Sequence, residues 1–238
     1  MNYNSPFMKM LETVANMLIV SFLWLLFSLP ILTVVPSCTA LYHTTCKVIF
    51  GEKRGNGVFK DFVDCFRLNL KEGVLLSLIV VVAVAFIAEG LWTGYQIYKL
   101  NIFGMLYMML GILITLLAVS MAVYIAPVLS RFIAPVGSVL RLSAYFAIKK
   151  PLRSIAYALL FALMVLLVET IPLAIMILPA VYTDLLRPTM EKDMTTFINE
   201  NNLESKDDED EEEEEEQIED STVDLDKKLS DQRKKGKK

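Results

Sequence analysis

The sequence predicts an all-α, polytopic membrane protein with four transmembrane helices, five being possible, and two or three short amphipathic helices. Of its 238 residues, 55% are hydrophobic, and the mean hydropathy is +0.49, values that soluble domains of this size rarely reach. Residues 13–46 and 100–130 contain no charged side chain, and residues 73–98 and 154–183 contain one glutamate each. Each stretch exceeds the roughly 20 residues that a helix needs to cross the hydrocarbon core.

The first span is predicted over residues 10–29 and ends at a proline-rich break. Pro30 and Pro36 lack a backbone donor and restrict the residue before them, so the helix should end ahead of them. Ser37 suits the N-cap of a second helix over 37–50. At about 1.5 Å per residue this helix would reach only about 21 Å. We therefore expect it to pack against the bundle or to be partly re-entrant.

The next segments are predicted to be one interfacial helix followed by two spans. Over 58–70, apolar residues recur at helical spacing and charged residues take the other positions, which predicts an amphipathic helix along the membrane interface. The second span (73–98) and the third (101–130) are joined by so short a link that they must be antiparallel neighbours. Gly90 and Gly94 have the small-xxx-small spacing of closely packed helices.

A second mildly amphipathic helix is predicted over 136–149, and Pro151 suits the first turn of a fourth span over 152–182. Residues 1–200 then form one helical membrane domain, with 15 basic and 11 acidic residues. Residues 201–238 hold 8 basic and 16 acidic residues and end in a basic cluster. Such a segment cannot bury enough apolar surface to fold, so we expect a disordered acidic tail.

The distribution of Lys and Arg predicts the orientation. Six lie between the first and second spans, five between the third and fourth, and one between the second and third. The positive-inside rule then puts loops 37–72 and 131–153 in the cytoplasm and both termini outside. The rival arrangement has five crossings, with residues 31–50 as a compressed second span and the N-terminus inside.

Several short motifs resemble those of one family. They are Ser28-Leu-Pro-Ile-Leu-Thr33, Thr39-Ala-Leu-Tyr42, the basic turn Lys47–Gly51, Val58-Phe-Lys-Asp-Phe62, Asn69-Leu-Lys71 and Ala147-Ile-Lys-Lys-Pro-Leu-Arg153. With them the chain resembles, over about residues 5–185, the YesL-like family of small bacterial integral membrane proteins, a domain of unknown function. The resemblance implies a bacterial cell membrane and an association with carbohydrate uptake. It implies no catalytic residues.

Two glutamates, Glu89 and Glu169, fall inside predicted spans. A carboxylate in hydrocarbon costs about 2.5–3.5 kcal/mol on insertion scales, so such residues usually face a bundle interior or water. Both are candidate contacts for an ion, a proton or a polar substrate. The alternative is that each lies near the outer interface and reaches water. The similar order of amphipathic helix, basic elbow and span around each one indicates either a weak transporter-like repeat or a chance likeness.

His43 is the only histidine, and it shares a predicted helical face with Thr39 and Cys46. It is a candidate substrate or ion ligand, the alternative being a packing histidine. The three cysteines have no C-x-x-C spacing, which predicts neither a disulfide framework nor a metal site. We expect no catalytic residues and no cofactor.

Basic residues beside the spans are candidates to bind anionic lipid headgroups, unless they serve only to set the topology. They are Lys47, Lys53, Arg54, Lys71, Arg141, Lys149, Lys150 and Arg153. No soluble basic domain is present, so nucleic-acid binding is not expected.

The resemblance implies a non-enzymatic accessory or regulatory component associated with carbohydrate uptake. Its expected partners are the lipid bilayer and a sugar-transporter permease or another membrane protein. The alternative is a small transporter or channel that uses Glu89 and Glu169. A membrane enzyme has the least support, because no nucleophile–base set, metal motif or nucleotide loop is recognisable.

Overall fold

The computed structural model describes residues 6–50, 57–98, 102–132 and 134–201. All regular elements in these residues are helices, so the predicted all-α class is confirmed. Four of the described helices are long and apolar enough to cross a membrane. They are α1 (Pro6–Phe27), α4 (Leu70–Ile97), α5 (Ile102–Arg131) and α7 (Pro151–Thr170).

The segment that follows α1 contains three short helices instead of a fifth span. They are the 3-10 helix Ile31–Thr33, α2 (Val34–His43) and the π-helix Thr44–Ile49. The expectation that Ser37 caps the second helix is wrong, because α2 begins at Val34 and Thr33 occupies the N-cap position. Pro36 lies in the first turn of α2, where its missing N–H has no intrahelical partner to lose.

The short helix α2 is the centre of the fold. It packs against α1, α3 (Val58–Leu68), α4, α5 and α8 (Leu178–Asn201), and seven of its ten residues are buried. The ring of Phe27 at the end of α1 meets the rings of Phe62 and Phe66 on α3, with centroids 5.6 and 4.8 Å apart. Residues 34–43 thus lie in the interior of the protein, covered on several sides by longer helices.

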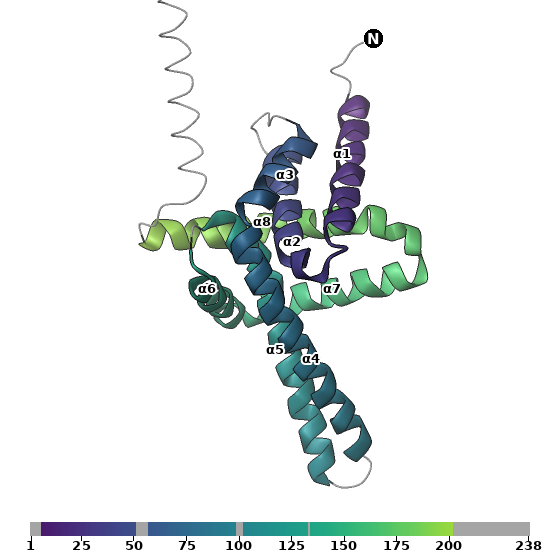
Figure 1. Ribbon diagram of the computed structural model, residues 1–238, viewed down its shortest axis with the longest axis vertical. Helices are drawn as coiled ribbons and strands as arrows, with labels where there is room; N and C mark the ends of the chain where they lie inside the picture. Colours follow the sequence, from purple (N-terminus) through teal and green to yellow (C-terminus); the bar gives the residue numbers. More distant parts are fainter. Residues whose placement is uncertain (1–5, 51–56, 99–101, 133, 202–238) are drawn as a thin grey trace, which may run out of the picture.

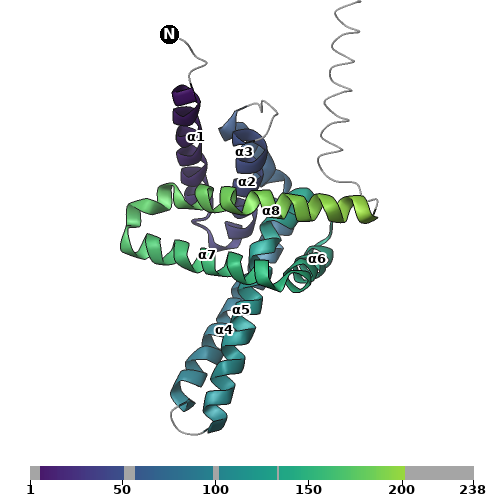
Figure 2. The ribbon, with the colours of Figure 1, turned by 180° about the vertical axis from the view of Figure 1, so that it is seen from behind.

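Around this centre the longer helices diverge (Figure 1). Helices α4 and α5 form the predicted antiparallel hairpin, which projects well beyond the other helices. The opposite view shows α7 running crosswise to this hairpin and α8 returning alongside α7 (Figure 2). Helix α6 (Val136–Lys149) packs on α5 and leads directly into the Lys150–Pro151 elbow before α7.

The fourth span is shorter than predicted. Helix α7 ends at Thr170, so the expected span over 152–182 is wrong in its last part. Pro172 disfavours helical geometry at Ile171, whose φ and ψ are −130° and 88°. The 3-10 helix Pro172–Met176 then reverses the chain into α8.

Helices α2 and α4 meet at a small-residue junction. The backbone N–H of Val35 donates to Oγ of Ser77 at 3.0 Å, and that hydroxyl donates in turn to the carbonyl of Gly73 at 2.9 Å. A Cβ at Gly73 would lie 2.8 Å from the ring of Pro36, so glycine permits this close approach. The first N–H groups of a helix have no intrahelical acceptor, and Ser77 supplies one from another helix.

We expect Ser77→Ala to leave the buried N–H of Val35 without its acceptor and to lower the free energy of unfolding by about 1–3 kcal/mol. Denaturation of the purified protein in detergent, followed by circular dichroism, would measure the loss. Ser138→Ala is the matched control, because Ser138 is exposed on α6. Equal stability of the two variants would show that the hydroxyl of Ser77 is dispensable.

Glycines also set the spacing of the α4–α5 hairpin. Gly94 and Gly104 are buried between its two helices. A Cβ at Gly94 would lie 2.8 Å from the sulfur of Met108, and one at Gly104 would lie 2.1 Å from the carbonyl oxygen of Ile97. The predicted packing role of the small residues on this span is therefore confirmed at Gly94.

Gly104→Ala should destabilise the protein by about 1–3 kcal/mol, because the opposing atom belongs to the backbone and the helices must separate. Thermal unfolding in detergent would show a lowered midpoint. Gly137→Ala on α6 provides the comparison, since a Cβ there meets nothing within 4 Å. If both variants unfold at the same midpoint temperature as the wild type, the hairpin does not depend on this close contact.

Candidate functional site

Ion pairs concentrate where α8 lies against the rest of the protein. Leu186, Met190, Met194 and Phe197 recur at helical spacing along α8 and pack into the main hydrophobic core. Charged residues flank this apolar stripe and reach basic residues from three other parts of the chain. We call these residues the α8 charge cluster: Arg131, Lys150, Arg153, Glu191 and Asp193.

Asp193 is the most buried member of the α8 charge cluster, with a side chain only 5% exposed. Nη1 of Arg153 donates to Oδ1 of Asp193 at 2.7 Å and to Oδ2 at 2.8 Å. Lys150 donates to Oδ1 as well. Because Pro151 begins α7, Lys150 and Arg153 flank the start of that helix. One buried carboxylate thus ties α8 to the elbow between α6 and α7.

Glu191 joins α8 to the protein interior. It forms an ion pair with Arg131 at the end of α5 and accepts a hydrogen bond of 2.9 Å from the hydroxyl of Tyr42 on α2. Burial raises the pKa of Tyr42 well above its ordinary value, so this phenol stays protonated and remains a donor. The bond connects residues 149 positions apart in the chain.

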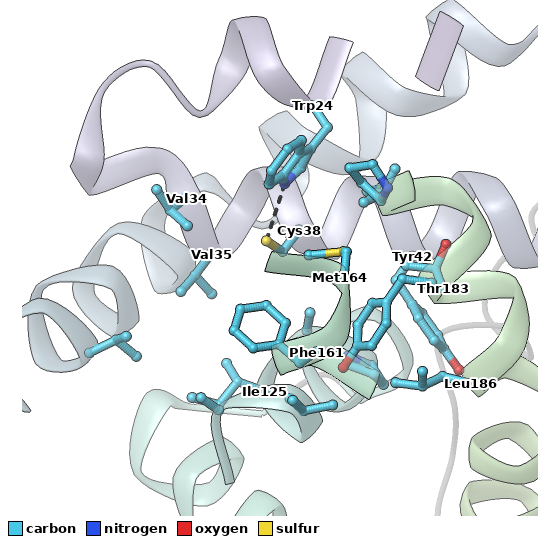
Figure 3. Close-up of a pocket in the computed structure, with 18 of the residues that line it drawn as sticks. Trp24, Val34, Val35, Cys38, Tyr42, Ile125, Phe161, Met164, Thr183 and Leu186 are labelled. Atoms are coloured by element: carbon cyan, nitrogen blue, oxygen red, sulfur yellow. Dashed lines mark hydrogen bonds between the residues drawn. The ribbon is translucent and has the colours of Figure 1, made fainter. Parts of the chain in front are cut away.

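A cavity of about 330 Å³ lies between α8, α2 and the spans. Its walls are almost wholly apolar and include Val34 and Val35 from the start of α2, Ile125 from α5, and Phe161 and Met164 from α7 (Figure 3). They also carry Trp24 from α1, whose indole N–H donates to the sulfur of Cys38 at 3.3 Å.

The two glutamates predicted as site residues lie on different helices. Glu89 is exposed on α4, in the projecting half of the hairpin, and Glu169 is exposed in the last turn of α7. Neither lines the cavity. The described structure therefore provides no common pocket for the two carboxylates.

His43 is half-buried at the end of α2, directly before the π-helix. Its predicted neighbours Thr39 and Cys46 are both buried, and Thr39 donates to the carbonyl of Val35 at 3.0 Å. Burial raises the pKa of Cys46 to about 12, so this thiol is neutral near pH 7. Within the described residues, no three His, Cys, Asp or Glu side chains are grouped as metal ligands would be.

The basic residues predicted to bind lipid headgroups fall into three sets. Lys71 and Arg141 are exposed and Lys47 is half-buried, while Lys53 and Arg54 lie outside the described residues. Lys149 lies 5.0 Å from the centre of the Tyr145 ring and 4.0 Å from Glu200. The last two, Lys150 and Arg153, contact Asp193 and so also serve the α8 charge cluster.

Comparison with known proteins finds a similarity over part of the chain. Residues 17–91 match the family described as Protein of unknown function, DUF624. The resemblance to a family of unknown function is thereby confirmed over this segment. No curated protein and no solved structure matches the chain.

The DUF624 segment contains most of α1, all of α2 and α3, and most of α4. It therefore includes the Val35–Ser77 junction and the cavity residues that come from α1, α2 and α4. Helix α8 lies outside it. The acids Glu191 and Asp193 were missed as site residues, although the apolar spacing from Leu186 to Phe197 is a signal that this segment folds back.

Asp193→Asn should loosen α8, because it removes the carboxylate that faces Lys150 and Arg153. We expect a cost of about 1.5–3 kcal/mol, nearer the lower figure because those cations are 34% and 45% exposed. Hydrogen exchange over residues 186–200 would report the opening. Lys192→Gln, at an exposed neighbouring position, is the control. Unchanged hydrogen exchange in Asp193→Asn would show that Asp193 does not hold α8 against the elbow between α6 and α7.

Proposed function

We propose that this protein is a non-enzymatic accessory or regulatory membrane component associated with carbohydrate uptake, and that it binds a sugar permease or another membrane protein through the α4–α5 hairpin. The proposed setting is a bacterial cell membrane, with loops 37–72 and 131–153 in the cytoplasm. The resemblance to the YesL-like family supports the link to carbohydrate uptake. The shape of the hairpin supports the binding role.

The projecting hairpin is the observation that carries the proposal. Among residues 81–97 and 102–119, the buried residues are Gly94 and Gly104, which face each other's helices. Large apolar side chains cover the outside, including Phe86, Trp92 and Phe103, which are 76%, 63% and 78% exposed. Such a surface must be covered by lipid or by the helices of another protein.

The pairing of the acidic residues on α8 supports a non-enzymatic role. Glu191 and Asp193 are each paired with basic residues of the same chain, and both pairs join separate helices. These carboxylates therefore hold helices together. Glu89 and Glu169 lie apart on exposed helix surfaces, which lends no support to a shared ion path.

Affinity purification of a tagged copy from native membranes in mild detergent tests the proposal. We expect a sugar permease at near-stoichiometric amount with the wild type and at least tenfold less with the double variant Phe86→Ala, Phe103→Ala. Leu173→Ala is the matched control, since Leu173 is 81% exposed but lies between α7 and α8. Mass spectrometry identifies and quantifies the recovered proteins.

Recovery of this protein alone would contradict the proposal and favour the transporter alternative. Purified protein in sealed vesicles would then be assayed for sugar flux. Flux that is present and is lost in Glu89→Gln, Glu169→Gln would establish that alternative. Flux that is absent, or unchanged by these substitutions, would count against it.

A further inference from the structure

The apolar cavity lies beside three of the apolar helices, α4, α5 and α7. Val84 is the fifteenth of 28 residues in α4, Val119 the eighteenth of 30 in α5, and Phe161 the eleventh of 20 in α7. Where α4 and α5 cross the bilayer, lipid tails surround their middle residues. The side chains of Val84 and Phe161 are 59% and 38% exposed, so this wall of the cavity opens to the surroundings of the spans.

The few polar side chains on the walls already have partners within the protein. Trp24 donates to Cys38 and Tyr42 to Glu191, at 3.3 and 2.9 Å. Tyr182 and Thr183 donate to backbone carbonyls at 3.4 and 2.8 Å. These bonds already use the N–H and O–H donors of the wall, so a sugar, whose hydroxyls would lose their hydrogen bonds to water on entry, would find few replacements there. The chemistry of the walls therefore selects an apolar occupant.

The size of the cavity fits a chain-like apolar group. An apolar cavity of roughly 150 Å³ in another protein stays dry and takes up benzene. This cavity, at about 330 Å³, is more than twice as large and has the same kind of lining. The apolar groups present at highest concentration beside its open wall are the tails of the surrounding lipids.

We propose that this cavity binds one acyl chain of a bilayer phospholipid, whose headgroup stays outside it. The inference goes beyond the proposed function and does not depend on it, because Phe86 and Phe103, the residues chosen to test permease binding, do not line the cavity. A bound chain would complete the packing between α2, α7 and α8. It would make a lipid part of the native structure.

Trp24 provides the test, because its indole lies on the wall (Figure 3). The chain has two tryptophans, and Trp92→Phe leaves Trp24 as the single tryptophan, whose emission can be excited selectively. This variant would be reconstituted in phosphatidylcholine vesicles with or without bromine atoms at mid-chain. We expect the brominated chains to quench Trp24 by at least half. Absence of quenching would overturn the proposal.

Variants that fill the cavity distinguish quenching by a bound acyl chain from quenching by lipid outside the cavity. Ala126→Phe places a ring in the cavity and should reduce the quenching at least twofold, whereas Ala156→Phe, at an exposed site on α7 outside the cavity, should not. Val123→Phe is the second filling variant if the first fails to fold. Equal quenching in filled and unfilled proteins would show that bromine reaches Trp24 from outside and would overturn the proposal.

Mass spectrometry of lipids retained by the purified protein identifies the occupant. We expect about one phospholipid per wild-type chain and per Ala156→Phe chain, and at least a fivefold loss in Ala126→Phe. A free fatty acid in its place would overturn the assignment to a phospholipid. Retention of no lipid, with the cavity filled by a side chain of a co-purifying protein, would overturn it as well.

Discussion

The hydrogen bond from the backbone of Val35 to Ser77 governs how the rest of the molecule is arranged. It satisfies an N–H group at the start of α2 that has no intrahelical acceptor, and it holds that start against α4, where Gly73 leaves room for Pro36. Because α2 also contacts α1, α3, α5 and α8, its position sets theirs. A helix too short to cross the bilayer thereby becomes the core around which the spans pack.

Hydropathy and length were sufficient to predict the spans, since a helix in hydrocarbon must be long and nearly free of charge. The same reasoning failed at the end of α7. Residues 171–182 are as apolar as a span requires, but Pro172 breaks the helix, and the chain turns back before it could continue. At Pro36 the error was the opposite one. The helix was expected to begin after this proline, at Ser37, but a proline in the first turn is compatible with a helix that starts two residues earlier.

The α8 charge cluster and the cavity were beyond sequence reasoning for a different reason. Asp193 meets Arg153 across 40 residues and Glu191 meets Tyr42 across 149, and no local spacing encodes such pairs. Lys150 and Arg153 were predicted to bind lipid headgroups because they lie beside a span, whereas their acidic partner Asp193 is 40 or more residues further along the chain. The cavity depends on side chains from six helices, whose relative positions only the fold supplies.

The contacts of α8 with α2, α5 and the elbow before α7 limit the order in which the protein can assemble. Helix α8 is synthesised after the four long apolar helices, so its contacts with Tyr42, Arg131 and Lys150 can form only once those residues have been made. Pro179, Thr183 and Leu186 of α8 make up one wall of the cavity. Before α8 docks, the cavity therefore lacks this wall. The docking of α8 completes this wall, while the side formed by Val84 and Phe161 stays open.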